Sequence, residues 1–260
     1  MRIEVNDVVV GYDSTVIVDG LTIRIPDGQI TTIIGSNGCG KSTLLKAITR
    51  IIPYQKGQVL LDGTDIHQKS TKALARELAI LPQTQDSAVG LLVEELVSYG
   101  RFPHQSGLST LKKEDKRVIE WAMEATNTLV FRHHSVDELS GGQKQRVWIA
   151  MALAQNTDII FLDEPTTYLD MAHQLEVLEL LEKLNEEENR TIVMVLHDLN
   201  HAARFSHYMI ALEKGLIVKA GTPDEVMTPD VLKKVFQIDA VIDKDPRFHK
   251  PICTTYNLIK

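Results

Sequence analysis

One segment constrains the fold of this chain more than any other, the glycine-rich run from Gly35 to Ser42. It has the pattern GxxxxGK[ST], with an apolar, strand-like run before it (Ile30–Ile34) and helical spacing after it (Leu44–Ile48). Glycines in such a loop let successive backbone N–H groups converge on phosphate oxygens, and the helix N-terminus adds partial positive charge. The alternative, an ordinary glycine-rich turn with an exposed lysine, explains neither flanking element. The segment therefore predicts a phosphate-binding loop between a strand and a helix.

Two side chains at the end of this loop have defined roles in the pattern. The lysine, Lys41, reaches the outer phosphates, and the hydroxyl of Ser42 binds Mg²⁺. Cys39 has no candidate base near it in the sequence, so we expect it to fill space rather than to react. The residues expected to bind the phosphates are Gly35, Ser36, Asn37, Gly38, Cys39, Gly40, Lys41, Ser42 and Thr43.

A second apolar run, Ile159–Leu162, ends in two carboxylates, Asp163 and Glu164. Ligands of open α/β sheets bind at the carboxyl ends of the strands, where these side chains would lie. Taken alone, the pair could equally be an acidic turn that ends a strand. In a chain with a phosphate-binding loop, we expect Asp163 to hold Mg²⁺ and Glu164 to polarise an attacking water. The two motifs together predict a nucleoside triphosphatase.

The hydrophobic pattern predicts an α/β fold with additions. The apolar runs named above, together with Thr191–Leu196, are typical of buried parallel strands joined by helices. Alternating apolar residues before residue 26 and an Asp62-Gly63 turn predict an antiparallel β portion at the N-terminus. Strand patterns disappear over residues 84–156, which favours an inserted helical subdomain. Within it, Arg101–Ser109 is expected to be an exposed loop, and residues 237–260 are expected to be a short C-terminal extension.

Composition excludes several classes of protein. The 260 residues are 43% hydrophobic, yet no apolar run approaches the roughly 18 residues of a membrane span. The first seven residues carry charges where a signal peptide needs apolar side chains, so we expect neither a span nor export. The net charge of −7 disfavours nucleic acid as a partner. Two distant cysteines, Cys39 and Cys253, indicate neither a zinc site nor a disulfide framework.

The motif that distinguishes among triphosphatases is Leu139-Ser140-Gly141-Gly142-Gln143, which precedes a helical pattern ending near Ala154. It forms a second glycine-lined helix N-terminus, and thus a second anion site. Here the sequence resembles the ATP-binding cassette (ABC) ATPases, whose signature is LSGGQ. The resemblance implies a P-loop NTPase (RecA-like) core with an N-terminal antiparallel β portion and an inserted α-helical subdomain, over about residues 3–236.

The resemblance extends to four further positions. Gln83 matches the glutamine that in the family contacts Mg²⁺ and water, and Asp170, in Thr167-Tyr168-Leu169-Asp170, matches the aspartate of the loop called the D-loop. His197, after Thr191–Leu196, matches the switch histidine that contacts the γ-phosphate. Tyr12 matches the aromatic residue that stacks on adenine, although a tyrosine at a strand end is also a common structural feature.

The resemblance also implies how the residues share the work. Two cassettes pair head to tail, so that Ser140, Gly141, Gly142 and Gln143 of one copy, with Asp170, act at the ATP bound by the other. The resemblance implies that the catalytic residues of this chain are Glu164, His197, Gln83 and Lys41. The implied Mg²⁺ ligands are Ser42, Gln83 and Asp163.

Two stretches are similar to the importers of ferric siderophores and their haem and cobalamin relatives: Glu94–His104 and Asp163–Gln174. One departure is Ser36, where that group usually has proline, and we expect a more flexible loop with binding intact. The implied partners are a second cassette, a separate transmembrane permease and, indirectly, a substrate-binding protein, with the chain peripheral at the cytoplasmic face of the membrane. A soluble ABC ATPase of DNA repair or translation is disfavoured, because only 96 residues separate Ser42 from Leu139.

Overall fold

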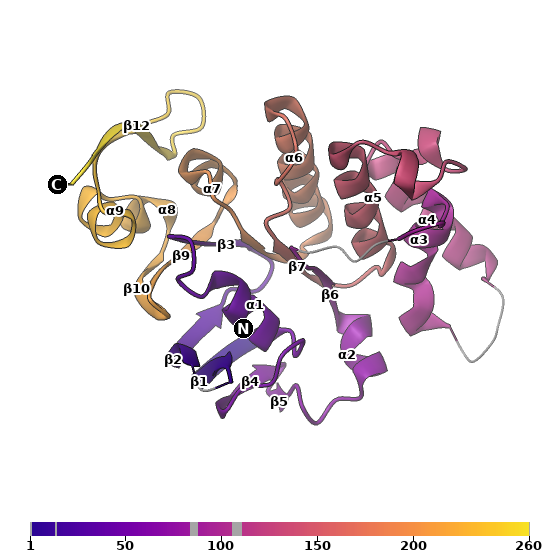
Figure 1. Cartoon of the computed structure of the whole chain (residues 1–260), viewed down its shortest axis with the longest axis horizontal. Helices are drawn as coiled ribbons and strands as arrows, with labels where there is room; N and C mark the ends of the chain where they lie inside the picture. The colour runs from indigo at the N-terminus through magenta and orange to yellow at the C-terminus, as the bar shows by residue number, and fades with distance from the viewer. Residues whose placement is uncertain (1, 14, 84–87, 106–110, 260) are drawn as a thin grey trace. The chain divides into compact units, whose positions relative to one another are not determined.

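The structure is a computed structural model, and it describes residues 2–13, 15–83, 88–105 and 111–259 (Figure 1). The chain divides into two compact units. The first unit comprises residues 1–69 and 191–260, and the second comprises residues 70–190. The second unit is therefore inserted into the first and is longer than the helical stretch expected from the sequence.

The first unit begins with an antiparallel sheet in the order β2-β1-β4-β5. Its strands are β1 (Ile3–Tyr12), β2 (Thr15–Ile25), β4 (Lys56–Leu61) and β5 (Thr64–Asp65). Alternate residues of β1 are buried, as the sequence pattern predicts, and Ile3 pairs with both Ile25 and Leu61. The Asp62-Gly63 turn joins β4 to β5. The antiparallel portion expected at the N-terminus is present.

Parallel strands form the other sheet portion of the first unit. Strand β3 (Ile30–Gly35) pairs in parallel with β8 (Thr191–Val195) and with β9 (Tyr208–Glu213), and β10 (Leu216–Gly221) adds an antiparallel edge. All residues of β3 and β8 are buried, which explains their continuous apolar sequence. Helix α1 (Lys41–Ile48) follows β3 through the glycine-rich loop.

The C-terminal part of the first unit contains three helices and a hairpin. The helices are α7 (Leu199–Phe205), α8 (Pro223–Val226) and α9 (Pro229–Phe236). Strands β11 (Ile238–Lys244) and β12 (Pro251–Leu258) then pair in antiparallel orientation. The region expected to be a short extension is thus an ordered hairpin, which packs on α7 and α9.

The second unit is mostly helical. Its two strands, β6 (Leu78–Leu81) and β7 (Ile159–Asp163), run in parallel, with Leu78 opposite Ile159. Every named element of the described residues within 84–156 is helical. These elements are α3 (Val93–Ser98), η1 (Tyr99–His104), α4 (Lys113–Ala125), η2 (Leu129–Phe131), η3 (Val136–Glu138) and α5 (Gly141–Ala154). Helices α2 (Thr71–Glu77) and α6 (Met171–Glu188) complete the unit.

The expectation of an exposed loop at Arg101–Ser109 is wrong for its first part. Tyr99–His104 is a 3₁₀ helix, and Arg101 is only 6% exposed. The guanidinium Nε of Arg101 lies 2.9 Å from Oδ1 of Asp115 in α4. Its Nη1 also donates to the carbonyl of Ala154, at 2.9 Å. The Pro and Gly residues suggested a loop, whereas the tertiary partners of Arg101 decide its burial. Residues 106–110 lie outside the described residues.

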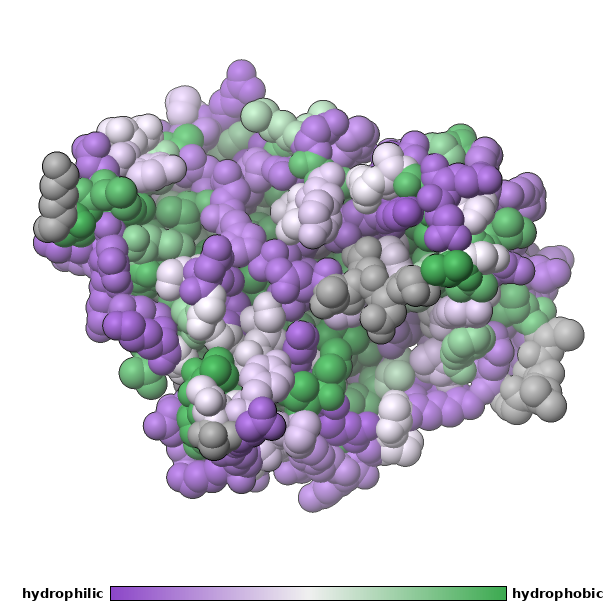
Figure 2. Space-filling model, in the orientation of Figure 1, coloured by the Kyte–Doolittle hydropathy of each residue, from purple (hydrophilic) through white to green (hydrophobic). Residues whose placement is uncertain are grey.

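Within the part of the chain that the structure describes, no helix is long and apolar enough to cross a membrane. On the face drawn in Figure 2, hydrophobic residues lie in patches interrupted by hydrophilic ones. This agrees with the ordinary composition of the sequence.

Candidate functional site

The glycine-rich loop has a backbone that only glycine adopts without strain at two positions. Gly38 has a φ of 75° and Gly40 a φ of 105°, both in the left-handed region. Gly40 precedes α1, and its carbonyl accepts the first helical hydrogen bond, from Leu44 at 2.8 Å. A Cβ on Gly38 would meet no atom within 4 Å, so this side of the loop is open. The loop thus presents backbone N–H groups at the start of α1, as phosphate binding requires.

Lys41 lies across the loop rather than in solvent. Its Nζ donates to the carbonyl oxygens of Gly35 at 2.8 Å and Ser36 at 3.0 Å, and the residue is 5% exposed. These contacts hold the ammonium group beside the backbone that would bind phosphate. Cys39 is 4% exposed, and burial raises the pKa of its thiol although Lys41 acts in the opposite direction. The thiol therefore stays protonated at neutral pH, which agrees with a space-filling side chain.

Residues distant in sequence, in the turn between β9 and β10 and in β2, pack against the loop. The carbonyl of Cys39 accepts a hydrogen bond from Gly215 N–H at 2.8 Å, in the turn between β9 and β10. A Cβ on Gly215 would lie 2.0 Å from the carbonyl oxygen of Ile17, and one on Gly40 would lie 3.2 Å from Cγ2 of Ile17. Sequence reasoning missed Ile17 and Gly215. The only signal is a lone glycine in a polar turn, which names no partner.

Tyr12 and His197 lie in the same unit as the loop. Tyr12 ends β1 opposite Thr15 and is 48% exposed, on the hairpin whose second strand carries Ile17 against Gly40. His197 follows β8 by two residues, as Gly35 follows Ile33 in β3, and Ile33 pairs with Val195. The switch histidine and the start of the loop therefore leave the sheet at the same edge.

Asp163 and Glu164 end β7 in the second unit. Asp163 is 1% exposed and Glu164 is 9% exposed. Glu164 has a φ of 55°, an uncommon conformation for a residue with a side chain, and its Oε2 accepts a hydrogen bond from the Thr167 hydroxyl at 3.3 Å. The Thr167 hydroxyl thus contacts this carboxylate in the turn that follows β7.

The signature motif caps a helix. Ser140 is the N-cap of α5, and its Oγ accepts a hydrogen bond from Gln143 N–H while the Gln143 side chain accepts one from Ser140 N–H. Ser140 and Gly141 are exposed, so the N-terminus of α5 faces outward from its unit. A Cβ on Gly142 would lie 3.2 Å from Leu169, which places the signature beside the D-loop.

Asp170 and Gln83 have less defined surroundings for ligand binding. Asp170 caps α6, where its Oδ1 accepts a hydrogen bond from His173 N–H at 2.9 Å, and this bond lowers the pKa of the carboxyl group. Its side chain also lies 2.8 Å from His173 Nδ1. Gln83 is exposed after β6, and the four residues that follow it lie outside the described residues. In the structure, Asp170 is thus a helix cap and Gln83 is an exposed side chain.

Each unit offers an oxygen donor of the kind that Mg²⁺ binds. Ser42, at the start of α1, offers a hydroxyl, and Asp163 offers a buried carboxylate at a strand end. Both are hard oxygen ligands, which Mg²⁺ prefers. The open, glycine-lined loop fits the phosphates that would supply further oxygens. The first unit thus groups Tyr12, the loop and His197, and the second groups the carboxylates, the signature and the D-loop.

The fold and these two groups of residues define a P-loop nucleotide-hydrolysing protein with an ABC signature. Residues 18–167 match the family described as ABC transporter, which is more than half of the chain. The chain is 62% identical over 251 residues to the iron(3+)-hydroxamate import ATP-binding protein FhuC of Bacillus subtilis (strain 168), covering 96% of this chain and 93% of that protein. It is 43% identical, over 96% of its length and 93% of the other, to the ferric enterobactin transport ATP-binding protein FepC of Escherichia coli (strain K12). The chain belongs to the ABC transporter family, as an ATP-hydrolysing ATP-binding subunit.

Solved structures agree with this assignment. One, of a metal-chelate type ABC transporter in an inward-facing conformation, has a TM-score of 0.82 and 26% identity, covering 97% of this chain and 96% of that one. A dimeric bacterial ABC transporter cassette has a TM-score of 0.76 and 29% identity, covering 85% of this chain and 98% of that one. The predicted P-loop α/β fold is therefore confirmed.

Proposed function

We propose that this chain couples ATP binding and hydrolysis to the uptake of an iron(III)-siderophore complex through a separate permease. The main evidence for this cargo is the 62% identity to a ferric-hydroxamate import ATP-binding protein across 96% of this chain. Relatives named for achromobactin, petrobactin and enterobactin transport are 40–48% identical. The cargo class is thus shared by relatives whose individual siderophores differ, and a hydroxamate is the first one to test.

The proposed catalysis depends on positioning and electrostatics. The loop N–H groups and Lys41 bind the outer phosphates of ATP, and Tyr12 stacks on the adenine. Glu164 orients and polarises the attacking water, with His197 at the γ-phosphate and Gln83 at the water. The place of Glu164 directly after β7, 9% exposed, supports this role, because ligands of open α/β sheets bind at the carboxyl ends of the strands.

Ser42, Asp163 and Gln83 would hold Mg²⁺. When bound there, the ion would neutralise negative charge on the phosphates. The proposed contribution of the chain is to offer these oxygen donors from the start of α1, the end of β7 and the end of β6.

We further propose a head-to-tail pair of cassettes. The capped and outward-facing N-terminus of α5 supports this arrangement, because Ser140, Gly141 and Gly142 are available to a nucleotide held by another chain. The permease would be a second type of partner and would hold the pair at the cytoplasmic face of the membrane, with a substrate-binding protein acting indirectly. Pairing on ATP and separation after hydrolysis would then drive transport.

The test is to reconstitute the full chain with its permease in lipid vesicles and to measure phosphate release with ATP and Mg²⁺. A ferric-hydroxamate-loaded binding protein should stimulate release above the unloaded one, and Lys41→Ala should abolish it. Stimulation by a haem-loaded or cobalamin-loaded protein instead would reassign the cargo. Phosphate release that is unchanged in Lys41→Ala would contradict the assignment of the phosphate loop.

A further inference from the structure

The C-terminal hairpin makes unusually specific contacts with α7, the helix that follows the switch histidine. Strand β12 packs along α7 within the first unit. His197 lies immediately before Asp198, which caps α7 by accepting a hydrogen bond from His201 N–H at 2.7 Å. Any element that holds α7 therefore also holds the turn that carries His197.

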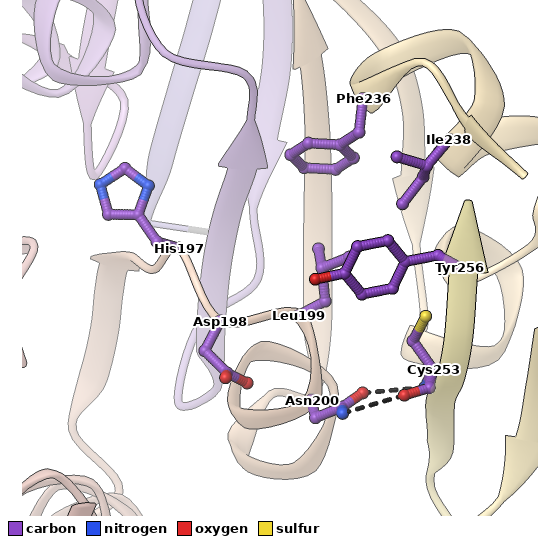
Figure 3. Close-up of a pocket in the computed structure, with 8 residues that line it drawn as sticks. All are labelled: His197, Asp198, Leu199, Asn200, Phe236, Ile238, Cys253 and Tyr256. Carbon is purple, nitrogen blue, oxygen red and sulfur yellow. Dashed lines mark hydrogen bonds between the residues drawn. The ribbon is translucent and has the colours of Figure 1, made fainter. Parts of the chain in front are cut away.

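The first contact is a pair of hydrogen bonds from one side chain. Asn200 Nδ2 donates to the carbonyl of Cys253 at 3.1 Å, and Cys253 N–H donates to Asn200 Oδ1 at 2.8 Å. Figure 3 shows both bonds between the first turn of α7 and β12. An amide that satisfies both backbone groups of one residue fixes the distance and the orientation of that strand, much as a neighbouring strand would.

Two further contacts hold the far end of α7. The guanidinium of Arg204 lies 4.0 Å from the ring centroid of Phe248 in the hairpin and 4.5 Å from that of its neighbour Phe205, within cation–π range of both. Lys250 Nζ donates to the carbonyl of Ser206 at 2.8 Å, at the C-terminus of the helix, where positive charge is favourable. The hairpin thus holds α7 at its beginning and at its end.

The hairpin also encloses space beside the histidine turn. A pocket of about 450 Å³ is lined by residues of this turn and by Phe236, Ile238, Cys253 and Tyr256. In Figure 3, the His197 ring points to the opposite side of the turn from Phe236, Ile238 and Tyr256. The hairpin forms hydrogen bonds in this region with Asn200, three residues after the histidine.

We propose that the C-terminal hairpin is a positioning element for His197, and that Asn200 is the residue through which the hairpin restrains the turn that contains His197. This inference rests on the proposed role of His197 at the γ-phosphate. The hairpin would fix the position of the His197 ring for hydrolysis while leaving the phosphate loop, which is on other elements, to bind ATP.

The test compares Asn200→Ala with Asn257→Ala, an exposed asparagine on the same hairpin, in the full chain reconstituted with its permease. Asn200→Ala should lower the kcat of ATP hydrolysis about tenfold, because small misplacements of a reacting group are costly. Its KM for ATP and its affinity for nucleotide should be unchanged. Asn257→Ala should behave as the parent chain. Phe248→Leu, which removes the stacking on Arg204, should give a smaller fall in kcat of the same kind.

A double-mutant cycle with His197→Ala separates this inference from the proposed function. If Asn200 acts through His197, the Asn200→Ala effect should vanish in the His197→Ala background. Equal losses in both backgrounds, or an unchanged kcat in Asn200→Ala, would overturn the positioning role. If His197→Ala alone leaves hydrolysis unchanged, the role of His197 in the proposed function fails, and the inference fails with it.

Discussion

At the scale of single residues, the backbone at Glu164 is the feature with the clearest consequence. A non-glycine residue at a φ of 55° costs free energy, and it is retained here directly after a buried strand. Glu164 lies at the end of this strand, where the proposed catalytic base would be placed. Glu164→Gln keeps the shape and removes the charge, so it isolates the chemical role.

We expect Glu164→Gln to bind ATP with nearly the affinity of the parent chain, to hydrolyse it at least about a hundredfold more slowly, and to accumulate as an ATP-bound dimer. Size-exclusion chromatography with ATP and Mg²⁺ measures the dimer, and phosphate release measures turnover. A variant that stays monomeric under these conditions would contradict the paired-cassette mechanism for this chain.

Gly215 offers a second test at this scale, because a matched glycine exists. Gly215 and Gly63 have φ values of 76° and 75°, but only a Cβ at Gly215 would clash, at 2.0 Å from Ile17 O. Alanine at Gly63 pays only the left-handed strain, about 1 kcal/mol. We expect Gly215→Ala to weaken ATP binding by displacing the support of the phosphate loop, as measured by titration calorimetry. Equal nucleotide affinities in the two variants would show that this turn does not support the loop.

At the scale of elements, a buried ion pair joins two helices of the second unit. The side chains of Arg101 in η1 and Asp115 in α4 are 7% and 8% exposed. Asp115 also caps α4 by accepting a hydrogen bond from Lys112 N–H at 3.0 Å. Burial raises the pKa of Asp115, but the bonds from Arg101 and Lys112 outweigh it and lower the pKa overall. The pair therefore ties two helices together in its ionised form.

We expect Asp115→Asn to lower the free energy of unfolding by about 3 kcal/mol at pH 7, because it leaves the Arg101 charge buried without its ionised partner. Chemical denaturation measures this loss, with Glu114→Gln in an exposed pair as the control, expected at less than about 1 kcal/mol. Because the pKa of Asp115 is lower in the folded chain than in the unfolded chain, the ionised carboxylate stabilises the fold above the unfolded pKa of about 4. This stabilisation is lost as the pH falls through the folded pKa. The difference in the free energy of unfolding between variant and parent should therefore become smaller below about pH 4. A difference that does not change with pH would contradict the ionised pair.

At the scale of the whole molecule, the question is which chain supplies the signature to each nucleotide. Lys41 and Ser140 lie in different units of one chain, and the proposed pairing brings Ser140 of one copy to the ATP held by Lys41 of the other. The arrangement can be tested with tagged heterodimers that contain the same two substitutions in different distributions.

A heterodimer of one Lys41→Ala chain and one Ser140→Arg chain should keep one intact site, because both changes then fall at the same nucleotide. A heterodimer of the double variant with a parent chain should keep none. Phosphate release from the tag-purified heterodimers, in complex with the permease, should therefore be higher for the first. The reverse order would show that loop and signature act within one chain.

The sequence by itself determined the local elements of this protein. A glycine-rich loop needs a strand before it and a helix after it, and the capping box at Ser140 needs only residues three positions apart. Such features depend on neighbours along the chain, so their patterns identified the fold class and the candidate residues. The expected burial of Ile30–Ile34, which the structure shows within β3, followed from the same local reasoning.

Only the tertiary structure decided which distant residues support these elements. Gly215 behind the loop, Asp115 beside Arg101 and Cys253 beside Asn200 are all long-range partners. Arg101 is buried although the composition of its segment predicts an exposed loop. The C-terminal residues form a hairpin that packs on α7. The physical reason is that a charge or an amide can be buried wherever the fold supplies its partner, and no local pattern encodes a partner that lies 14 to 176 positions away.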